Sequence, residues 1–283
     1  MRERHDSKTL RYRFDSLQEV QRYIEATKRT WRTRSSEANP PEMSWDLEAG
    51  YHGALKLARD GWREGAQALK SALVRLPALD PAPALVYDTD GIQADIGRVC
   101  AGVPECMLRP SPEALEGSTQ VITLAVAINA SGGTGARYMA NYGTAIARYI
   151  DELEAQGHQV EVIAAICSEV SGMRVAHTWM VKAAGDTVSL ATLAFSIGHP
   201  AAFRRFGFAL RERLDKALVK PSAGYGYSVD LTLADLINPS PGTVILNGMK
   251  NADSIARTTE HALAAIGKQI DAALTNPEAR SAS

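Results

Sequence analysis

The sequence is poor in cysteine, and this scarcity excludes two classes of protein. Three cysteines occur in 283 residues: Cys100, Cys106 and Cys167. An odd number without close pairing argues against a disulfide framework and favours a reducing compartment. Cys100 and Cys106 have no second cysteine pair and no histidine near them in the sequence, so we expect no zinc site.

Long apolar runs and an excess of one charge are missing too. No run approaches the roughly 20 apolar residues of a membrane helix, and the first ten residues, MRERHDSKTL, lack the apolar core of a signal peptide. The net charge of −1 creates no field that would draw the chain to nucleic acid or to an anionic membrane. We therefore expect a cytosolic protein without membrane contact, and we read its basic N-terminal flank as solvated.

Motifs of nucleophilic catalysis are absent from the sequence. Ser131 and Ser189 lie in no Gly-x-Ser-x-Gly motif. His177 falls in a predicted strand, and His199 precedes Pro200 at a predicted helix start, where it is an N-cap or core-edge residue. We expect no catalytic residue and no enzyme.

Residues 1–117 predict a mainly helical region with one short strand. Asp15 or Ser16 can cap a first helix, and Glu19 has the capping-box spacing from Ser16. Further helices are expected near Trp45, ending at Gly61, and over residues 62–76; a strand is expected at 84–87. The acidic residues at 88, 90 and 95 favour turns and an N-cap rather than a metal site.

Residues 118–275 predict an α/β domain, followed by a flexible tail at 276–283. Apolar runs at 121–128 and 160–166 enclose a long amphipathic helix, and further strands are expected at 173–182 and 243–246. This order favours a doubly wound, mostly parallel, Rossmann-like sheet covered by helices on both faces. Small residues including Gly143 are expected to let the long helix pack close to the sheet.

Three stretches of the first 108 residues carry a resemblance. FDSLQEVQRYI, SWDLEAGYHGALKLARDGWREG and VYDTDGIQADIGRVCAGVPECML resemble a class of uncharacterised proteins encoded by tailed bacteriophages. The resemblance covers most of the chain and implies a viral protein that is located in the host cytoplasm or incorporated in the virion. It implies no activity.

The element order from residue 121 to 274 resembles the von Willebrand factor A, or integrin I-like, fold. That family binds Mg²⁺ through Asp-x-Ser-x-Ser after its first strand, a threonine from a second loop and a later Asp-Gly. By this resemblance the corresponding residues here are Asn129, Ser131, Gly133, Thr187 and Asn247. Both carboxylate positions are amides, and a hard cation prefers anionic oxygens. The resemblance thus implies a degenerate metal-ion-dependent adhesion site without metal, whose amides hydrogen-bond across the loops.

Two functions remain open at this point. The first is a non-enzymatic module for protein–protein interaction or assembly, with a phage or host partner. The alternative is a nucleotide- or phosphate-binding protein that uses the backbone N–H groups of Gly132 to Gly135, although neither a dinucleotide glycine spacing nor a Walker lysine is present. In either case no cofactor is expected, and the candidate binding residues are Asn129, Ser131, Gly133, Thr134, Thr187 and Asn247.

A cluster of arginines follows Pro200. We expect Arg204, Arg205, Arg211 and Arg213 on the outer face or edge of a helix, interrupted by Glu212 and Asp215. Without an aromatic platform this face predicts salt bridges or solvent contact rather than nucleic-acid binding.

Overall fold

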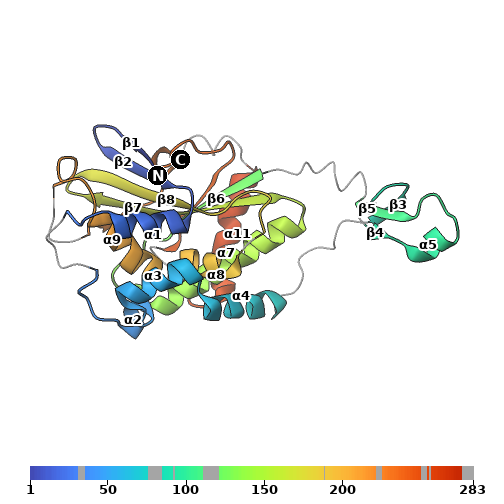
Figure 1. Ribbon diagram of the computed structural model, residues 1–283, viewed down its shortest axis with the longest axis horizontal. Helices are drawn as coiled ribbons and strands as arrows, with labels where there is room; N and C mark the ends of the chain where they lie inside the picture. Colours follow the sequence, from blue (N-terminus) through green and yellow to red (C-terminus); the bar gives the residue numbers. More distant parts are fainter. Residues whose placement is uncertain are drawn as a thin grey trace.

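The architecture is an α/β fold built on one mixed sheet, seen in a computed structural model of the chain (Figure 1). The structure describes residues 1–30, 36–75, 85–91, 93–110, 121–187, 189–220, 225–249, 254 and 256–275. The predicted boundary at 117–118 and the predicted tail lie outside these residues. Among the described helices, none is long and apolar enough to cross a membrane.

The main sheet has the strand order β1-β2-β8-β7-β6-β10, with β9 paired to β7. The strands are β1 (Arg2–His5), β2 (Thr9–Phe14), β6 (Val121–Ala127), β7 (Gln159–Val170), β8 (Met173–Lys182), β9 (Tyr227–Ser228) and β10 (Val244–Leu246). β6 is parallel to β7 and β10, and β2 is parallel to β8. β8 and β9 run antiparallel to β7, and β1 antiparallel to β2. The sheet is therefore mixed: the central pair β8–β7 is antiparallel, and the pairs β2–β8, β7–β6 and β6–β10 are parallel, so most of its neighbouring pairs are parallel as the apolar runs predicted.

Helices cover one face of this sheet. They are α1 (Leu17–Ala26), α2 (Met43–Asp46), α3 (Gly50–Asp60), α4 (Arg63–Arg75), α7 (Ala136–Ala155), α8 (Leu190–Leu193), α9 (Phe208–Arg211) and α11 (Thr259–Thr275), with π-helical turns η1 (Ala194–Gly198) and η2 (Ala202–Gly207). One apolar cluster joins this helical layer to the inward residues of β2, β6, β7 and β8. Figure 1 shows the sheet above this helical layer.

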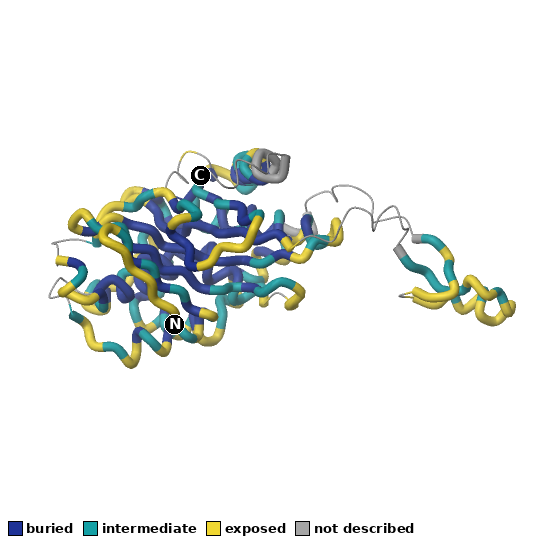
Figure 2. Tube along the Cα trace, turned by 90° about the horizontal axis from the view of Figure 1, so that it is seen from above, coloured by how far each residue is buried: buried dark blue, intermediate teal, exposed yellow. Residues whose placement is uncertain are grey.

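On the opposite face of the sheet, the structure differs from the doubly wound prediction of helices on both faces. There the sheet presents small side chains, Ala125, Ala127, Ala165, Cys167 and Ala176. They are covered by residues 229–240, which include the 3₁₀ turn η3 (Leu233–Asp235) and which we call the cover segment. Because these side chains are small, a single irregular segment is enough to bury them. Figure 2, which views the molecule from above, shows the central strands as buried.

The N-terminal residues differ from the predicted helical region, because they begin with two strands. β2 alternates between half-buried and buried positions, and Leu10, Tyr12 and Phe14 enter the same core as β6 and β7. The expected helix signals are confirmed: Ser16 Oγ accepts from the Glu19 N–H at 3.1 Å, and the Gly61 N–H donates to Leu57 O at the end of α3. Residues 1–30 and 36–75 are thus part of the main fold.

A second, three-stranded sheet has the order β3-β5-β4. It consists of β3 (Leu85–Asp88), β4 (Gln93–Ala94) and β5 (Met107–Pro110), with the short helix α5 (Ile96–Cys100). The predicted turn chemistry is confirmed, because the Asp95 side chain caps α5 by accepting from the Arg98 N–H at 3.2 Å. Asp88 accepts from the Thr89 N–H and pairs with Arg109 at 2.6 Å.

Gly143 of α7 packs against the π-helical layer rather than against the sheet. A Cβ at this position would lie 2.4 Å from Gly198 Cα and 2.8 Å from Gly198 N in η1. The predicted close approach therefore exists, but its partner is a helical turn. After Pro200, η2 and α9 replace the single regular helix that was expected.

Candidate functional site

Two asparagines lie at the carboxyl edge of neighbouring parallel strands. Asn129 follows β6 and Asn247 follows β10, and these strands run in the same direction. Asn129 is buried; its Oδ1 accepts from the Cys167 N–H at 3.1 Å, and its Nδ2 donates to Val229 O at 3.2 Å. Asn247 exchanges two hydrogen bonds of 2.8 Å with the backbone N–H and C=O of Leu231. The predicted amide contacts across the loops are confirmed, and both hold the cover segment.

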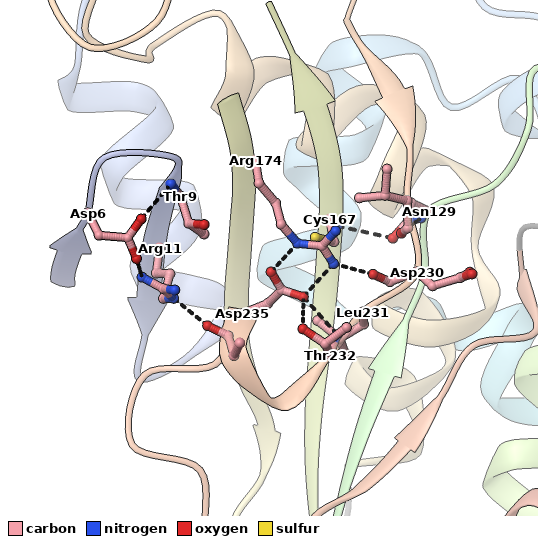
Figure 3. Close-up of polar contacts among 12 residues, drawn as sticks. Asp6, Thr9, Arg11, Asn129, Cys167, Arg174, Asp230, Leu231, Thr232 and Asp235 are labelled. Carbon is pink, nitrogen blue, oxygen red and sulfur yellow. Dashed lines mark hydrogen bonds and ion pairs between the residues drawn. The ribbon is translucent and has the colours of Figure 1, made fainter. Parts of the chain in front are cut away.

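A buried ion pair fixes the same segment further along (Figure 3). Arg174 of β8 pairs with Asp235, which is 1% exposed, and its Nη2 also donates to Asp230 O. Asp235 in turn accepts from the Thr232 N–H at 2.7 Å and from the Thr232 hydroxyl at 2.8 Å. Burial alone would raise the pKa of Asp235, but these donors hold it below its usual value.

We expect Asn247→Ala to lower the free energy of unfolding by about 1–2 kcal/mol, because it removes two hydrogen bonds and leaves the Leu231 backbone groups without these partners. Urea denaturation measures the loss. Asn247→Asp is the matched variant: it keeps the acceptor for the Leu231 N–H but loses the donor to Leu231 O. Equal stability of Asn247→Ala and the wild type would show that these bonds do not hold the cover segment.

The loop after β6 is attached to the helical layer from within. Ser131 Oγ lies 2.8 Å from Thr134 Oγ1, and Thr134 is 1% exposed. The backbone carbonyls of Ser131 and Thr134 both accept from Arg204 Nη2. Gly132 and Gly133 are exposed, and an added Cβ would meet nothing within 4 Å at either residue. The backbone carbonyls of Ser131 and Thr134 therefore bind the Arg204 side chain, whereas Gly132 and Gly133 lie at the surface.

Thr187 does not belong to this site. β8 runs antiparallel to β7, so the loop after β8 lies at the opposite edge of the sheet from the loops after β6 and β10. A Cβ at nearby Gly185 would lie 3.8 Å from Gln159 Oε1, at the start of β7. The prediction for Thr187 is wrong because the sequence did not show on which edge its loop emerges.

The arginines after Pro200 are buried rather than solvated. Arg204, Arg205 and Arg211 are each 1% exposed. Arg205 pairs with Asp46 at 2.6 Å and donates to the carbonyls of Ser36, Asn39 and Pro40. Arg213 donates to Ile24 O and Thr27 O. These side chains hold the N-terminal segments onto the core, so they offer no face to a nucleic acid.

A cavity of about 590 Å³ opens beside the loop after β6. We call it the edge cavity; it is lined by Asn39, Trp45, Ala130, Ser131, Gly132, Phe203, Phe208, Arg211, Tyr225, Gly226, Tyr227 and Ser228. The Phe208 and Tyr225 rings stack with centroids 3.9 Å apart. Tyr227 is 83% exposed. Of the predicted binding residues, the cavity contains Ser131; Gly132, from the alternative phosphate loop, is its neighbour there.

Arg211 is the charged residue of the cavity lining. One Nη donates to Tyr225 O, whereas Nε and the other Nη have no hydrogen-bond partner in the part of the chain that the structure describes. Burial lowers the pKa of Arg211 to about 10, so the guanidinium stays charged at neutral pH. Its neighbours do not balance this charge: burial raises the pKa of Cys167 to about 12, and burial together with the charge of Arg211 lowers the pKa of His177 to about 3.

The family comes from the sequence comparison. A family model described as a domain of unknown function (DUF7192) matches residues 2–270. The chain belongs to this family. No curated protein and no solved structure matches it.

The residues matched by the DUF7192 family model include the strands of both sheets and the residues that line the edge cavity. The described residues contain no group of three His, Cys, Asp or Glu side chains that could hold a metal ion. Sequence reasoning missed Arg211 and the aromatic lining of this DUF7192 cavity. The lining comes from segments around residues 39–45, 130–132, 203–211 and 225–228, and nothing in the local sequence shows that these segments converge.

Proposed function

We propose that this protein is a binding protein rather than an enzyme, and that the edge cavity is its ligand site. The observation that carries the proposal is the position of the cavity at the carboxyl end of β6, where open α/β sheets take their ligands. Its volume of about 590 Å³ is in the range of small-molecule sites. Five aromatic residues line it and supply apolar contact area: Trp45, Phe203, Phe208, Tyr225 and Tyr227.

The residues around the cavity favour binding over catalysis. Among the residues that the structure describes, its lining contains no carboxylate and no histidine that could act as a general base. Cys167, the nearby thiol, is fully buried with a pKa raised to about 12, and the thiolate is the nucleophilic form. The phosphate-loop hypothesis enters the proposal in altered form, because Ser131 and Gly132 form a wall of the cavity while the loop carbonyls bind Arg204.

The test compares ligand binding by two variants, in which tryptophan replaces one or the other of two adjacent glycines. Gly132 lines the cavity and Gly133 does not, and both have open space around them. We expect the neutral probes benzamide and indole to bind saturably to the wild type and to Gly133→Trp. Binding to Gly132→Trp should be weaker by about tenfold or more, because the indole ring occupies the cavity. Saturation-transfer NMR and calorimetric titration measure both affinities.

The contrary results are clear. Absence of saturable binding of either probe to the wild type, or equal affinity of Gly132→Trp and Gly133→Trp, would show that the edge cavity is not a ligand site. Comparison of the two variants also separates occupation of the cavity from the general effect of an added exposed tryptophan.

Protein–protein interaction is a second candidate, favoured by the small sheet. Ile96 is 68%, Val99 47% and Tyr87 43% exposed, and such exposed apolar residues are found at contact surfaces. The resemblances to tailed-phage proteins and to the von Willebrand factor A fold, with host-cytoplasmic or virion location, belong to this candidate. In a quantitative pull-down, the double variant Ile96→Asp/Val99→Asp should lose a partner that the wild type retains. Identical partners for both proteins would exclude these residues as the contact.

A further inference from the structure

Arg211 gives the edge cavity a cationic end. The side chain is 1% exposed, and two of its nitrogen atoms have no hydrogen-bond partner in the described chain. A charged donor removed from water costs free energy unless a partner within the protein or a ligand replaces the water. Arg211 is one of the residues that line the cavity, so a ligand bound there would lie beside this buried side chain.

Three other arginines of this region have their charge or most of their donors satisfied within the protein, although Arg204 Nε also lacks a hydrogen-bond partner in the described chain. Arg205 pairs with Asp46, and Arg174 pairs with Asp235. Arg204 directs its two Nη atoms to the carbonyls of Trp45, Ser131 and Thr134. Arg211 has one such bond, to Tyr225 O, and no ion pair within the described residues. It differs from these arginines because it lines a cavity in which the described lining residues include no carboxylate.

The lining of the cavity is also rich in aromatic side chains. Phe208 and Tyr225 are stacked at 3.9 Å, and Trp45 lies 6.4 Å from Phe208 between ring centroids. Tyr227 adds a ring that is 83% exposed. Planar groups stack favourably on such side chains. The hydroxyl of Ser228 bonds to Ala130 O at 3.2 Å, so the lining combines several rings with few free polar groups besides Arg211.

We propose that the edge cavity takes a ligand in which a planar ring carries an anionic group, carboxylate or phosphate, with the anion paired to Arg211. The ring stacks on the aromatic lining, and the anion accepts from the free Nε and Nη groups in the paired geometry that a guanidinium offers to carboxylates and phosphates. This inference rests on the proposed ligand site and names the chemical class that the site selects.

The experiment uses the full chain and two matched pairs of probes. Benzamide and benzoate differ in charge on a ring, and adenosine and adenosine monophosphate differ in a phosphate. We expect the anionic member of at least one pair to bind about tenfold more tightly than its neutral member, as a charge-assisted hydrogen bond predicts. Preference for benzoate identifies a carboxylate ligand, and preference for the monophosphate identifies a phosphate ligand.

Arg211→Gln tests the assigned residue. Its amide can still donate to Tyr225 O, and we expect the tenfold preference to disappear while the neutral probes keep their affinity within about twofold. Arg137→Gln is the control, because it removes the same charge from an exposed position at the start of α7. It should leave the preference unchanged.

Four outcomes would overturn the inference. Equal affinity of neutral and anionic members for the wild type contradicts it even if Arg211→Gln does not fold. An unchanged preference in Arg211→Gln, or an equal loss of neutral and anionic binding, shows that Arg211 does not recognise the anion. If neutral probes bind without any anionic preference, the ligand site stands and the assigned class is wrong; if no probe binds, both fail.

Discussion

Asp46→Asn is expected to lower the free energy of unfolding by about 3–5 kcal/mol, because it leaves the Arg205 guanidinium buried without its carboxylate. The side chains of Asp46 and Arg205 are 0% and 1% exposed, and their contact is 2.6 Å. Asp46 also accepts from the Glu42 N–H at 2.9 Å and from the Gly50 N–H at 3.0 Å. Urea denaturation followed by far-UV circular dichroism measures the loss.

Asp46 further stabilises an unusual turn. Leu47 and Glu48, between its two backbone partners, have φ of 53° and 59°, a left-handed conformation that costs free energy in non-glycine residues. The amide of the Asn variant can accept at one of the two oxygen positions only, so one backbone contact is lost along with the charge.

A double variant and an exposed pair supply the controls. Asp46→Leu with Arg205→Met should be less destabilised than the sum of its single variants, because no unpaired charge remains. Asp60 pairs with Arg59 at the surface, with side chains 40% and 63% exposed, and Asp60→Asn should leave stability unchanged within error. Equal effects of Asp46→Asn and Asp60→Asn would exclude a structural role for the buried pair.

Gly143→Ala is expected to lower the free energy of unfolding by about 2–3 kcal/mol through overpacking. The new Cβ would lie 2.4 Å from Gly198 Cα and 2.8 Å from Ile197 O. These are backbone atoms, so α7 and η1 must move apart. The gain of up to about 1 kcal/mol in helix propensity does not offset this. Thermal and urea unfolding measure the change.

Gly133→Ala is the matched control for this substitution. Its Cβ would meet nothing within 4 Å, and its φ is not positive. We therefore expect no loss of stability there. If Gly143→Ala were as stable as Gly133→Ala, the helical layer would have to accommodate a methyl group at its closest contact without cost.

The unit β6–α7–β7 was predictable from sequence because its signals are local. The apolar runs, the glycine-containing turn and the 3.6-residue spacing of α7 all lie within 50 consecutive residues. The same applies to the Ser16 cap and the Gly61 helix end. Asn129 and Asn247 could be placed at one edge because their strands are parallel.

The remaining features depend on partners far away in the sequence. β2 alternates as a strand should, but its arginines suggested a solvated flank; in the structure Arg11 and Arg13 donate to cover-segment carbonyls more than 220 residues away. The buried state of Arg204, Arg205 and Arg211 likewise depends on carbonyls and a carboxylate from other segments. The position of Thr187 depended on the direction of β8. Local patterns contain none of this information.

The position of β2 in the sheet has a consequence for how the chain folds during synthesis. Thr9 pairs with Arg174, so β2 leaves the ribosome about 165 residues before β8, the strand that joins it to the rest of the sheet. At roughly 5–20 residues per second, its apolar face waits on the order of ten seconds or more for a partner. During that interval the apolar side chains of β2 are accessible to chaperones and to neighbouring nascent chains; these side chains are Leu10, Tyr12 and Phe14. β2 can join β7 and β6 in the main sheet only after β8, which lies between β2 and β7, has been made.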